Sequence, residues 1–256
     1  MSTPELTEDL RGGVLRLTIC REERRNAMSA AVLAGLAAAL ERVNRTREAQ
    51  AIVVTGAGTK AFCAGADLQT GTSFRFDYSQ PTLQMADLLR LARSVQVPLI
   101  ARVNGACVAG GMGLIGMCDL AVAARHAVFG LPEVKVGLFP AQVLSVLHGE
   151  LPRRVLNEMC ITGEPITADR AYEVGLVNAV ADDVDTALDA LLARIVDKSP
   201  AAMRRGLYTL KRSEEMAFED SIAFTESQIG LLALTEDAAE GQAAFREKRQ
   251  PAWKGR

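Results

Sequence analysis

Two stretches of small residues could bring backbone N–H groups to one point. The first runs from Lys60 to Leu68 and contains Ala64-Gly65-Ala66; the second runs from Asn104 to Leu114 and contains Ala109-Gly110-Gly111. Small residues let a ligand approach the backbone closely, and free N–H groups at a helix start carry the positive end of the helix dipole. Two such turns, brought together, could hydrogen-bond one oxygen that becomes negative during a reaction. Each stretch alone is also typical of a structural turn.

One carboxylate lies in a segment suited to proton transfer. Glu133 sits among apolar residues, prolines and glycines in Phe129-Gly-Leu-Pro-Glu-Val-Lys-Val-Gly-Leu-Phe-Pro140. Burial there would raise the pKa of this carboxyl toward neutrality, where it could both take up and release a proton. The alternative is a structural ion pair with Lys135 or with an arginine elsewhere in the chain.

A third motif, Gly56-Ala-Gly-Thr-Lys-Ala61, directly follows an apolar run and resembles a dinucleotide-binding turn. That fingerprint requires a helix to open at the glycines, so that its N-terminus faces a pyrophosphate. The chain instead continues Phe-Cys-Ala-Gly-Ala-Asp-Leu, without helical periodicity. A nicotinamide-dependent oxidoreductase is therefore a weak alternative.

The elements that must position these residues alternate between strands and helices in the first half of the chain, which predicts an α/β core. The pattern predicts strands at Val14–Ile19, Ala51–Thr55, Leu99–Val103, Leu120–Ala124, Ala127–Gly130 and Leu176–Val180, and helices at Ser29–Val43 and Leu83–Val95. From about residue 143 the sequence becomes mainly helical, with helices expected at Val143–Leu151, Arg153–Cys160, Ala168–Val174, Thr186–Lys198, Ala201–Lys211 and Ser221–Leu234.

Composition excludes several classes of protein. The 256 residues are 49% hydrophobic and carry a net charge of −2, which provides no cationic field for coating nucleic acid or anionic lipid. Five cysteines without a C-x-x-C pair, together with two histidines, do not make a usual zinc set. No apolar run is long enough to cross a bilayer, and the N-terminus is not signal-like. We expect a cytoplasmic protein with reduced thiols, no metal and no membrane or nucleic-acid partner.

Four blocks, in this order, resemble the enoyl-CoA hydratase/isomerase (crotonase) family. They are AIVVTGAGTKAFCAGADL, PLIARVNGACVAGG, CDLAVAARHAVFGLPEVKVGLFP and ITGEPITADRAYEVGLVNAV. The resemblance implies an acyl-CoA thioester substrate whose carbonyl oxygen is bound by the amides of Ala66 and Gly110, with Glu133 as acid/base. It also implies that five residues line the coenzyme A groove: Arg25, Ala27, Lys60, Ala64 and Leu68. Coenzyme A is then part of the substrate, and no separate cofactor is expected.

The same resemblance implies a spiral of ββα units followed by a C-terminal helical layer. Residues 1–190 would form the α/β core and residues 191–256 a helical region for trimerisation. Family members assemble as trimers or as dimers of trimers, and the C-terminal part, here including Phe245 and Lys254, can complete a neighbour's site.

The chain departs from the family pattern at Gly113, where typical hydratases carry a first glutamate. With Glu133 alone, the simplest chemistry is a proton shuttle that moves a double bond, as in the single-glutamate isomerases; a slower hydration stays open. Ala141 replaces the Asp of dienoyl isomerases and related hydrolases, which disfavours those activities. A protein that binds an acyl-CoA ester but has lost the chemistry is the alternative that Gly113 supports.

Overall fold

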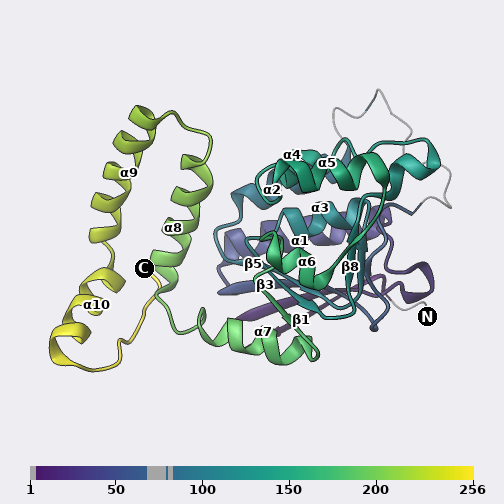
Figure 1. The fold of residues 1–256 in the computed structure, drawn as a ribbon. Coiled ribbons are helices and arrows are strands. Elements are labelled where there is room, and N and C mark those ends of the chain that lie inside the picture. The colour runs from purple at the N-terminus through teal and green to yellow at the C-terminus, as the bar shows by residue number, and fades with distance from the viewer. Residues whose placement is uncertain (1–3, 68–78, 80–82) are drawn as a thin grey trace.

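The computed structural model describes residues 4–67, 79 and 83–256 (Figure 1). A six-stranded sheet has the order β1-β2-β3-β5-β7-β10, and a four-stranded sheet has the order β4-β6-β8-β9. The strands are β1 (Leu6–Arg11), β2 (Val14–Ile19), β3 (Ala51–Gly56), β4 (Ala61–Cys63), β5 (Leu99–Val103), β6 (Ala106–Val108), β7 (Leu120–Ala124), β8 (Val128–Gly130), β9 (Ile166–Thr167) and β10 (Ala179–Ala181).

The first pair, β1 and β2, lies within the larger sheet, and each of the next three pairs places one strand in each sheet, which makes the fold a spiral of ββα units. β3, β5 and β7 lie side by side in the larger sheet, and β4, β6 and β8 follow them into the smaller one. The helices α1 (Ala30–Thr46), α2 (Gln84–Ser94) and α3 (Gly110–Gly116) follow the first, second and third pairs. The predicted α/β class and the ββα spiral are therefore confirmed.

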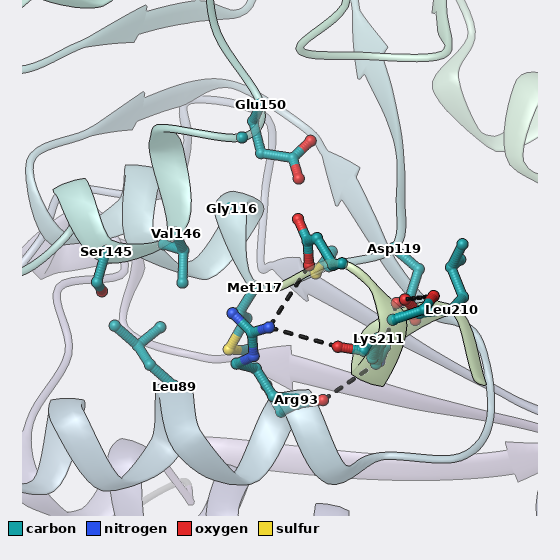
Figure 2. A pocket seen from close by; sticks show the side chains of 15 residues that line it. Leu89, Arg93, Gly116, Met117, Asp119, Ser145, Val146, Glu150, Leu210 and Lys211 are labelled. Atoms are coloured by element: carbon teal, nitrogen blue, oxygen red, sulfur yellow. Dashed lines mark hydrogen bonds and ion pairs between the residues drawn. The ribbon is translucent and has the colours of Figure 1, made fainter. Parts of the chain in front are cut away.

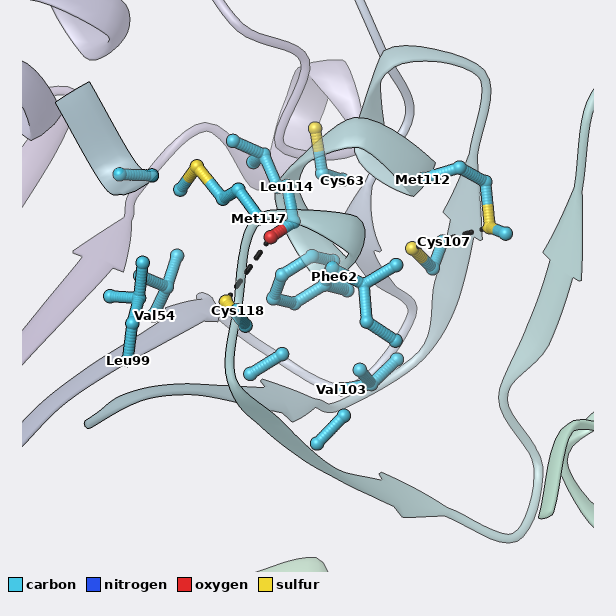
Figure 3. Packing of buried hydrophobic residues seen from close by; sticks show 14 of the residues in the cluster. Val54, Phe62, Cys63, Leu99, Val103, Cys107, Met112, Leu114, Met117 and Cys118 are labelled. Atoms are coloured by element: carbon cyan, nitrogen blue, oxygen red, sulfur yellow. Dashed lines mark hydrogen bonds between the residues drawn. The ribbon is translucent and has the colours of Figure 1, made fainter. Parts of the chain in front are cut away.

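The main hydrophobic core lies between the two sheets and helices α1 to α3, as Figure 3 shows for Phe62, Leu99 and Met112. Central strand β3 is buried along its whole length because it has parallel neighbours on both sides and apolar layers on both faces. Helix α1 begins where Ser29 Oγ accepts a hydrogen bond from the amide of Val32, as the sequence predicted. A second, smaller cluster packs helix α7 (Val184–Ala193) on the other face of the larger sheet.

The remaining helices are α4 (Leu144–Leu147), α5 (Arg153–Thr162), α6 (Ala168–Glu173), α8 (Pro200–Ser213), α9 (Phe218–Ala233) and α10 (Glu236–Glu247). Helices α8 to α10 form an arm that stands away from the sheets (Figure 1). The arm is tied to the core by Lys211, whose Nζ lies 2.9 Å from Asp119. The predicted division at residues 190 and 191 falls inside α7, and it stays a prediction.

The structure differs from the sequence-based expectations in three details. The segment Leu6–Arg11 is a strand, β1, for which the sequence analysis made no prediction; it is an edge strand, where charged residues are common. The strand predicted at Leu176–Val180 is Ala179–Ala181, because the side chain of Asn178 bonds the amide of Ala121 just before the ladder begins. The helix predicted at Thr186–Lys198 is α7, which starts at Val184 beneath the capping side chain of Asp183 and ends at Ala193.

Candidate active site

The two small-residue turns meet because each follows one of two neighbouring parallel strands. β4 pairs with β6 in parallel, so the C-terminal ends of both strands lie at the same edge of the smaller sheet. A Cβ atom built on Gly65 would lie 2.8 Å from the Cβ of Ala109 and 2.9 Å from the amide nitrogen of Gly110. Only glycine fits at position 65, which also has a φ of +92°. The backbone near Ala66 and the start of α3 are thus in direct contact.

The amide of Ala66 is left free by the bonds on either side of it. Met28 donates its N–H to the carbonyl of Gly65 (2.7 Å) and accepts from the amide of Asp67 (3.1 Å). These two bonds form a parallel bridge opposite Ala66, so the N–H of Ala66 itself faces away from Met28. It has no acceptor among the described residues.

Gly110 is the first residue of α3, and its N–H therefore has no partner within the helix. The preceding residue, Ala109, has a φ of +53° and a ψ of −125°, an unusual conformation for alanine. It is held there by a hydrogen bond of 2.9 Å from its amide to the carbonyl of Gly130. A Cβ atom on Gly110 would lie 3.5 Å from the amide nitrogen of Ala66, so the two unpaired amides belong to one small region.

Glu133 follows the third strand of the same sheet edge. β8 pairs with β6 in parallel and runs through Leu131 into the short 3₁₀ helix η3 (Pro132–Val136), which carries Glu133. Its side chain is half-buried, and its Oε2 is buried without a hydrogen-bond partner among the described residues. Burial raises the pKa of Glu133 above its usual value. The alternative of a structural ion pair is wrong: Lys135 bonds Glu164 at 2.7 Å, and no arginine among the described residues pairs with Glu133.

Two of the predicted groove residues meet around a second feature, a cavity of about 240 Å³ lined by Arg25 and Lys60. Ala64 is joined to Arg25 by a hydrogen bond, in which the amide of Ala64 donates to the carbonyl of Arg25 (3.1 Å). Ala27 is buried, with its carbonyl bonded by the guanidinium of Arg21 (2.6 Å). Leu68 lies outside the described residues.

Other candidates raised by the sequence do not carry chemistry in this structure. The turn Gly56–Ala61 leads into strand β4 and opens no helix, which removes the basis for dinucleotide binding. Cys63 and Cys107 are fully buried in the core (Figure 3), and burial raises the pKa of Cys63 to about 12, so neither is a ready nucleophile. In the described part of the chain, no group of three or more His, Cys, Asp or Glu could hold a metal.

A larger cavity of about 440 Å³ lies away from these residues. Figure 2 shows it between α2, the far end of α3 and the arm, lined by Arg93, Asp119, Glu150 and Lys211 among others. None of the described site residues that the sequence predicted lines it. The ion pair between Asp119 and Lys211, both largely buried, makes it a junction between arm and core.

Comparison with known proteins agrees with this geometry. A sequence profile described as enoyl-CoA hydratase/isomerase matches residues 9–256. The chain belongs to the enoyl-CoA hydratase/isomerase family. It is 35% identical to the 2,3-dehydroadipyl-CoA hydratase of Escherichia coli, over 95% of this chain and 96% of that protein. It is 33% identical to enoyl-CoA hydratase EchA19 of Mycobacterium tuberculosis, over 100% of this chain and 98% of that protein.

Solved structures lead to the same family. The chain superposes on the crystal structure of an enoyl-CoA hydratase from Mycobacterium smegmatis with a TM-score of 0.90 and 34% identity, covering 98% of this chain and 99% of the other. It is thus an enzyme of the hydratase/isomerase family, with an α/β core of the enoyl-CoA hydratase kind. Among helices in the described ranges, none is long and apolar enough to cross a membrane.

Sequence reasoning missed several residues that shape this region. Asn26 and Asn104 are buried side chains that bond the turn carrying Lys60, and His126 bonds the same turn from outside. The dipeptide Asn104-Gly105 stood within one of the four blocks that resemble the family, and Asn26 stood between the expected groove residues Arg25 and Ala27. A buried polar amide must have partners, so their positions next to apolar strands were the available signal.

Proposed function

We propose that this enzyme binds an acyl-CoA thioester with its carbonyl oxygen between the amides of Ala66 and Gly110, and moves a proton with Glu133. The observation that carries the proposal is the contact of the two turns, in which two unpaired N–H groups share one small region. Preorganised N–H donors stabilise a negative oxygen at little reorganisation cost. The unpartnered Oε2 of Glu133, at the same sheet edge, supports its role as the acid/base.

The chemistry needs only these three groups. The carboxylate of Glu133 removes a proton from the carbon next to the thioester carbonyl of a 3-enoyl-CoA. The electron pair of the broken C–H bond moves onto the thioester oxygen, which forms an enolate held by the two amides. Glu133 then returns the proton to the fourth carbon, and the double bond becomes conjugated with the thioester. No water is consumed, and the carboxylate is regenerated.

Gly113 favours this double-bond shift over hydration. It lies one helical turn after Gly110 on α3, where it offers no side chain to hold or activate water. A Cβ atom there would lie 2.6 Å from Cε of Met85 and 2.9 Å from Cγ1 of Val143. The space that a second carboxylate needs is therefore occupied by apolar side chains.

The test is incubation with 2-enoyl-, 3-enoyl- and 3-hydroxyacyl-CoA thioesters, followed by product analysis. We expect 3-enoyl-CoA to be converted to 2-enoyl-CoA faster than 2-enoyl-CoA is hydrated. Hydration at an equal or higher rate would reassign the enzyme as a hydratase with a single glutamate. Binding of all three thioesters without turnover would support the alternative, a binder of acyl-CoA that has lost the chemistry.

The remaining parts of the proposal concern assembly and setting. Large apolar side chains cover the arm, among them Phe218, Leu234 and Phe245, and they support a homotrimer or a dimer of trimers. Coenzyme A would enter only as part of the substrate, with no further cofactor and no metal. The five free cysteines fit a reducing, cytoplasmic setting, and a place in fatty acid metabolism follows from the acyl-CoA substrate.

A further inference from the structure

The turn from Ala57 to Ala61 has an uncommon pattern of hydrogen bonds. It joins β3 to β4 and lines the smaller cavity beside Arg25. Each of its five consecutive carbonyl groups accepts a hydrogen bond from elsewhere in the protein. Three side chains, of Asn26, Asn104 and His126, and one backbone amide, of Ala106, supply the donors.

The two buried asparagines use every donor they have on this turn. Asn26 Nδ2 donates to the carbonyls of Ala57 (3.0 Å) and Ala61 (2.7 Å). Asn104 Nδ2 donates to the carbonyls of Gly58 (2.8 Å) and Ala61 (3.0 Å). Their Oδ1 atoms accept from the backbone amides of Arg21 and Gly56 (3.1 Å each), so each asparagine side chain is satisfied and fixed in orientation.

The two carbonyls between these are held as well. His126 Nε2 lies 2.9 Å from the carbonyl of Thr59, which can only accept, so the ring nitrogen donates. The carbonyl of Lys60 accepts from the amide of Ala106 (3.1 Å). Gly105 is pressed against this peptide, since a Cβ there would lie 2.5 Å from the carbonyl carbon of Lys60. Both residues of this pair therefore contact the turn. Asn104 donates hydrogen bonds from its side-chain amide, and Gly105 allows close approach because it has no side chain.

With its carbonyls drawn inward, the turn presents donors outward. The amides of Gly58, Thr59 and Lys60 have no acceptor among the described residues, and all three residues are exposed. Successive free N–H groups in a turn make a concavity that favours anions. The smaller cavity beside this turn is lined by two cations, Arg25 and Lys60, and by two carboxylates, Glu22 and Glu23, so its charged side chains balance and the free amides supply the net attraction for an anion. The Glu22 carboxylate lies against Gly58, where a Cβ would lie 2.0 Å from its Oε2. A carbonyl turned outward here would place a partial negative charge against any bound phosphate.

We propose that Asn26, Asn104 and His126 are positioning residues that keep the 57–61 turn ready for the phosphates of coenzyme A. This inference rests on the proposed function, because it assumes that the substrate is a coenzyme A thioester. The three side chains touch no reacting atom; they act through the turn, and their contribution is confined to the phosphate-bearing half of the substrate.

The first test uses His126, whose exposed side chain places Nε2 near the carbonyls of Thr59 (2.9 Å) and Asn104 (3.2 Å). We expect His126→Ala to raise KM for an enoyl-CoA about 3- to 10-fold, the range for one lost hydrogen bond, with kcat unchanged. His126→Gln, which keeps a donor, should retain the wild-type KM. The pantetheine thioester of the same acyl group has no such phosphates, and its KM should be equal for all three proteins. An equal rise in KM for both thioesters overturns the proposal.

The second test uses the buried side chains. Asn104→Ala leaves the carbonyls of Gly58 and Ala61 without this donor, so its effect on KM for the enoyl-CoA should exceed that of His126→Ala, again with little change for the pantetheine thioester. Thermal unfolding reports whether the variant is folded; if it is not, the His126 pair decides alone. An Asn104→Ala protein that is folded and has a wild-type KM for the enoyl-CoA overturns the proposal.

Failure of the proposed function is seen separately, by calorimetry with coenzyme A and pantetheine. A wild-type protein that binds coenzyme A more tightly than pantetheine but turns over no enoyl thioester contradicts the proton-transfer proposal only, and the His126 variants are then compared by binding. A wild-type protein that turns over enoyl thioesters but binds coenzyme A and pantetheine equally contradicts the phosphate assignment only.

Discussion

The turns around Ala66 and Gly110 differ from the C-terminal arm in whether their interactions are satisfied within one chain. The two turns are fixed by short backbone hydrogen bonds within one chain, including Met28 to Gly65 (2.7 Å) and Ala109 to Gly130 (2.9 Å). On the arm, by contrast, the side chains of Phe218, Leu234 and Phe245 are 75%, 81% and 86% exposed. One region has its partners within the chain, and the other leaves large apolar groups uncovered.

This difference suggests that the core of one chain sets the geometry of the site, whereas the arm provides a surface for association. The backbone geometry near the proposed site is determined by three adjacent parallel strands, and a single chain contains all of them. The arm holds itself together through buried Asp237, which accepts hydrogen bonds from Ser199 Oγ (2.6 Å) and from the amide of Lys254 (2.7 Å). Burial of its outer apolar surface would release about 25 cal/mol for each Å², which favours association with further copies.

The largest effect is expected at Glu133. Glu133→Gln keeps the size of the side chain and removes its ability to take up a proton, so kcat should fall by about 100-fold or more. Binding of the acyl-CoA should remain close to that of the wild type, as measured by calorimetry. Unchanged turnover would show that another residue is the acid/base. The three groups proposed at this edge of the smaller sheet would then not make up the whole site.

A methyl group at position 65 tests whether the two turns must touch. In Gly65→Ala the new Cβ would meet Ala109 at 2.8 Å and the amide nitrogen of Gly110 at 2.9 Å. We expect kcat to fall about 100-fold, as for the loss of one oxyanion donor. Gly175→Ala is the control, because Gly175 also has a positive φ (+87°) but nothing within 4 Å of its Cβ position. Gly175→Ala should lose about 1 kcal/mol of stability from backbone strain. Gly65→Ala should lose more, because its Cβ also clashes with Ala109 and Gly110, and only Gly65→Ala should lose activity.

The arm is tested by a charge on its apolar surface. Leu234→Glu should dissociate the trimer or dimer of trimers, because a carboxylate is costly to bury in an interface. Sedimentation should then report a lower mass than for the wild type. Leu10→Glu is the control, since Leu10 is an exposed leucine on strand β1 of the core, and the assembly should be retained. A wild-type protein that sediments as a monomer contradicts the trimer and removes the contrast between the two regions.

The smallest effect concerns stability and pH. Burial raises the pKa of Glu133 in the folded protein above its value in the unfolded chain. Its contribution to stability is therefore fully present below the unfolded pKa and is lost as pH rises through the folded pKa. Glu133→Gln should thus raise the free energy of unfolding at neutral pH, and this gain should vanish on acidification toward pH ~4. Urea unfolding across this range measures it, and Glu226→Gln on the exposed arm is the control; a gain that persists in acid contradicts the assignment.

Much of this architecture follows from the sequence because buried strands and capped helices have strong local signals. The apolar run at Ala51–Thr55 and the Ser29 cap identified β3 and α1, and the resemblance in motif order implied the ββα spiral. Strand β1 was not predictable in this way, since one polar edge strand carries no apolar period. The amide directions at Ala66 and Gly110 and the filled space at Gly113 depend on residues far away in the chain, so no local pattern contains them.

The proposed donors for the thioester oxygen are main-chain groups, and this affects how the protein tolerates mutation. Replacing a side chain cannot delete an N–H, and position 66 is already alanine. An alanine scan would therefore detect the acid directly, but it would miss the oxyanion-binding site at Ala66 itself and would reach that site only where a neighbouring glycine such as Gly65 is changed to alanine. Only changes that bend the peptide, such as added bulk at the neighbouring glycines or proline in place of the donor residue, would expose it. Sequence drift can then reshape the acyl pocket and exchange the acid while the anion-stabilising groups persist.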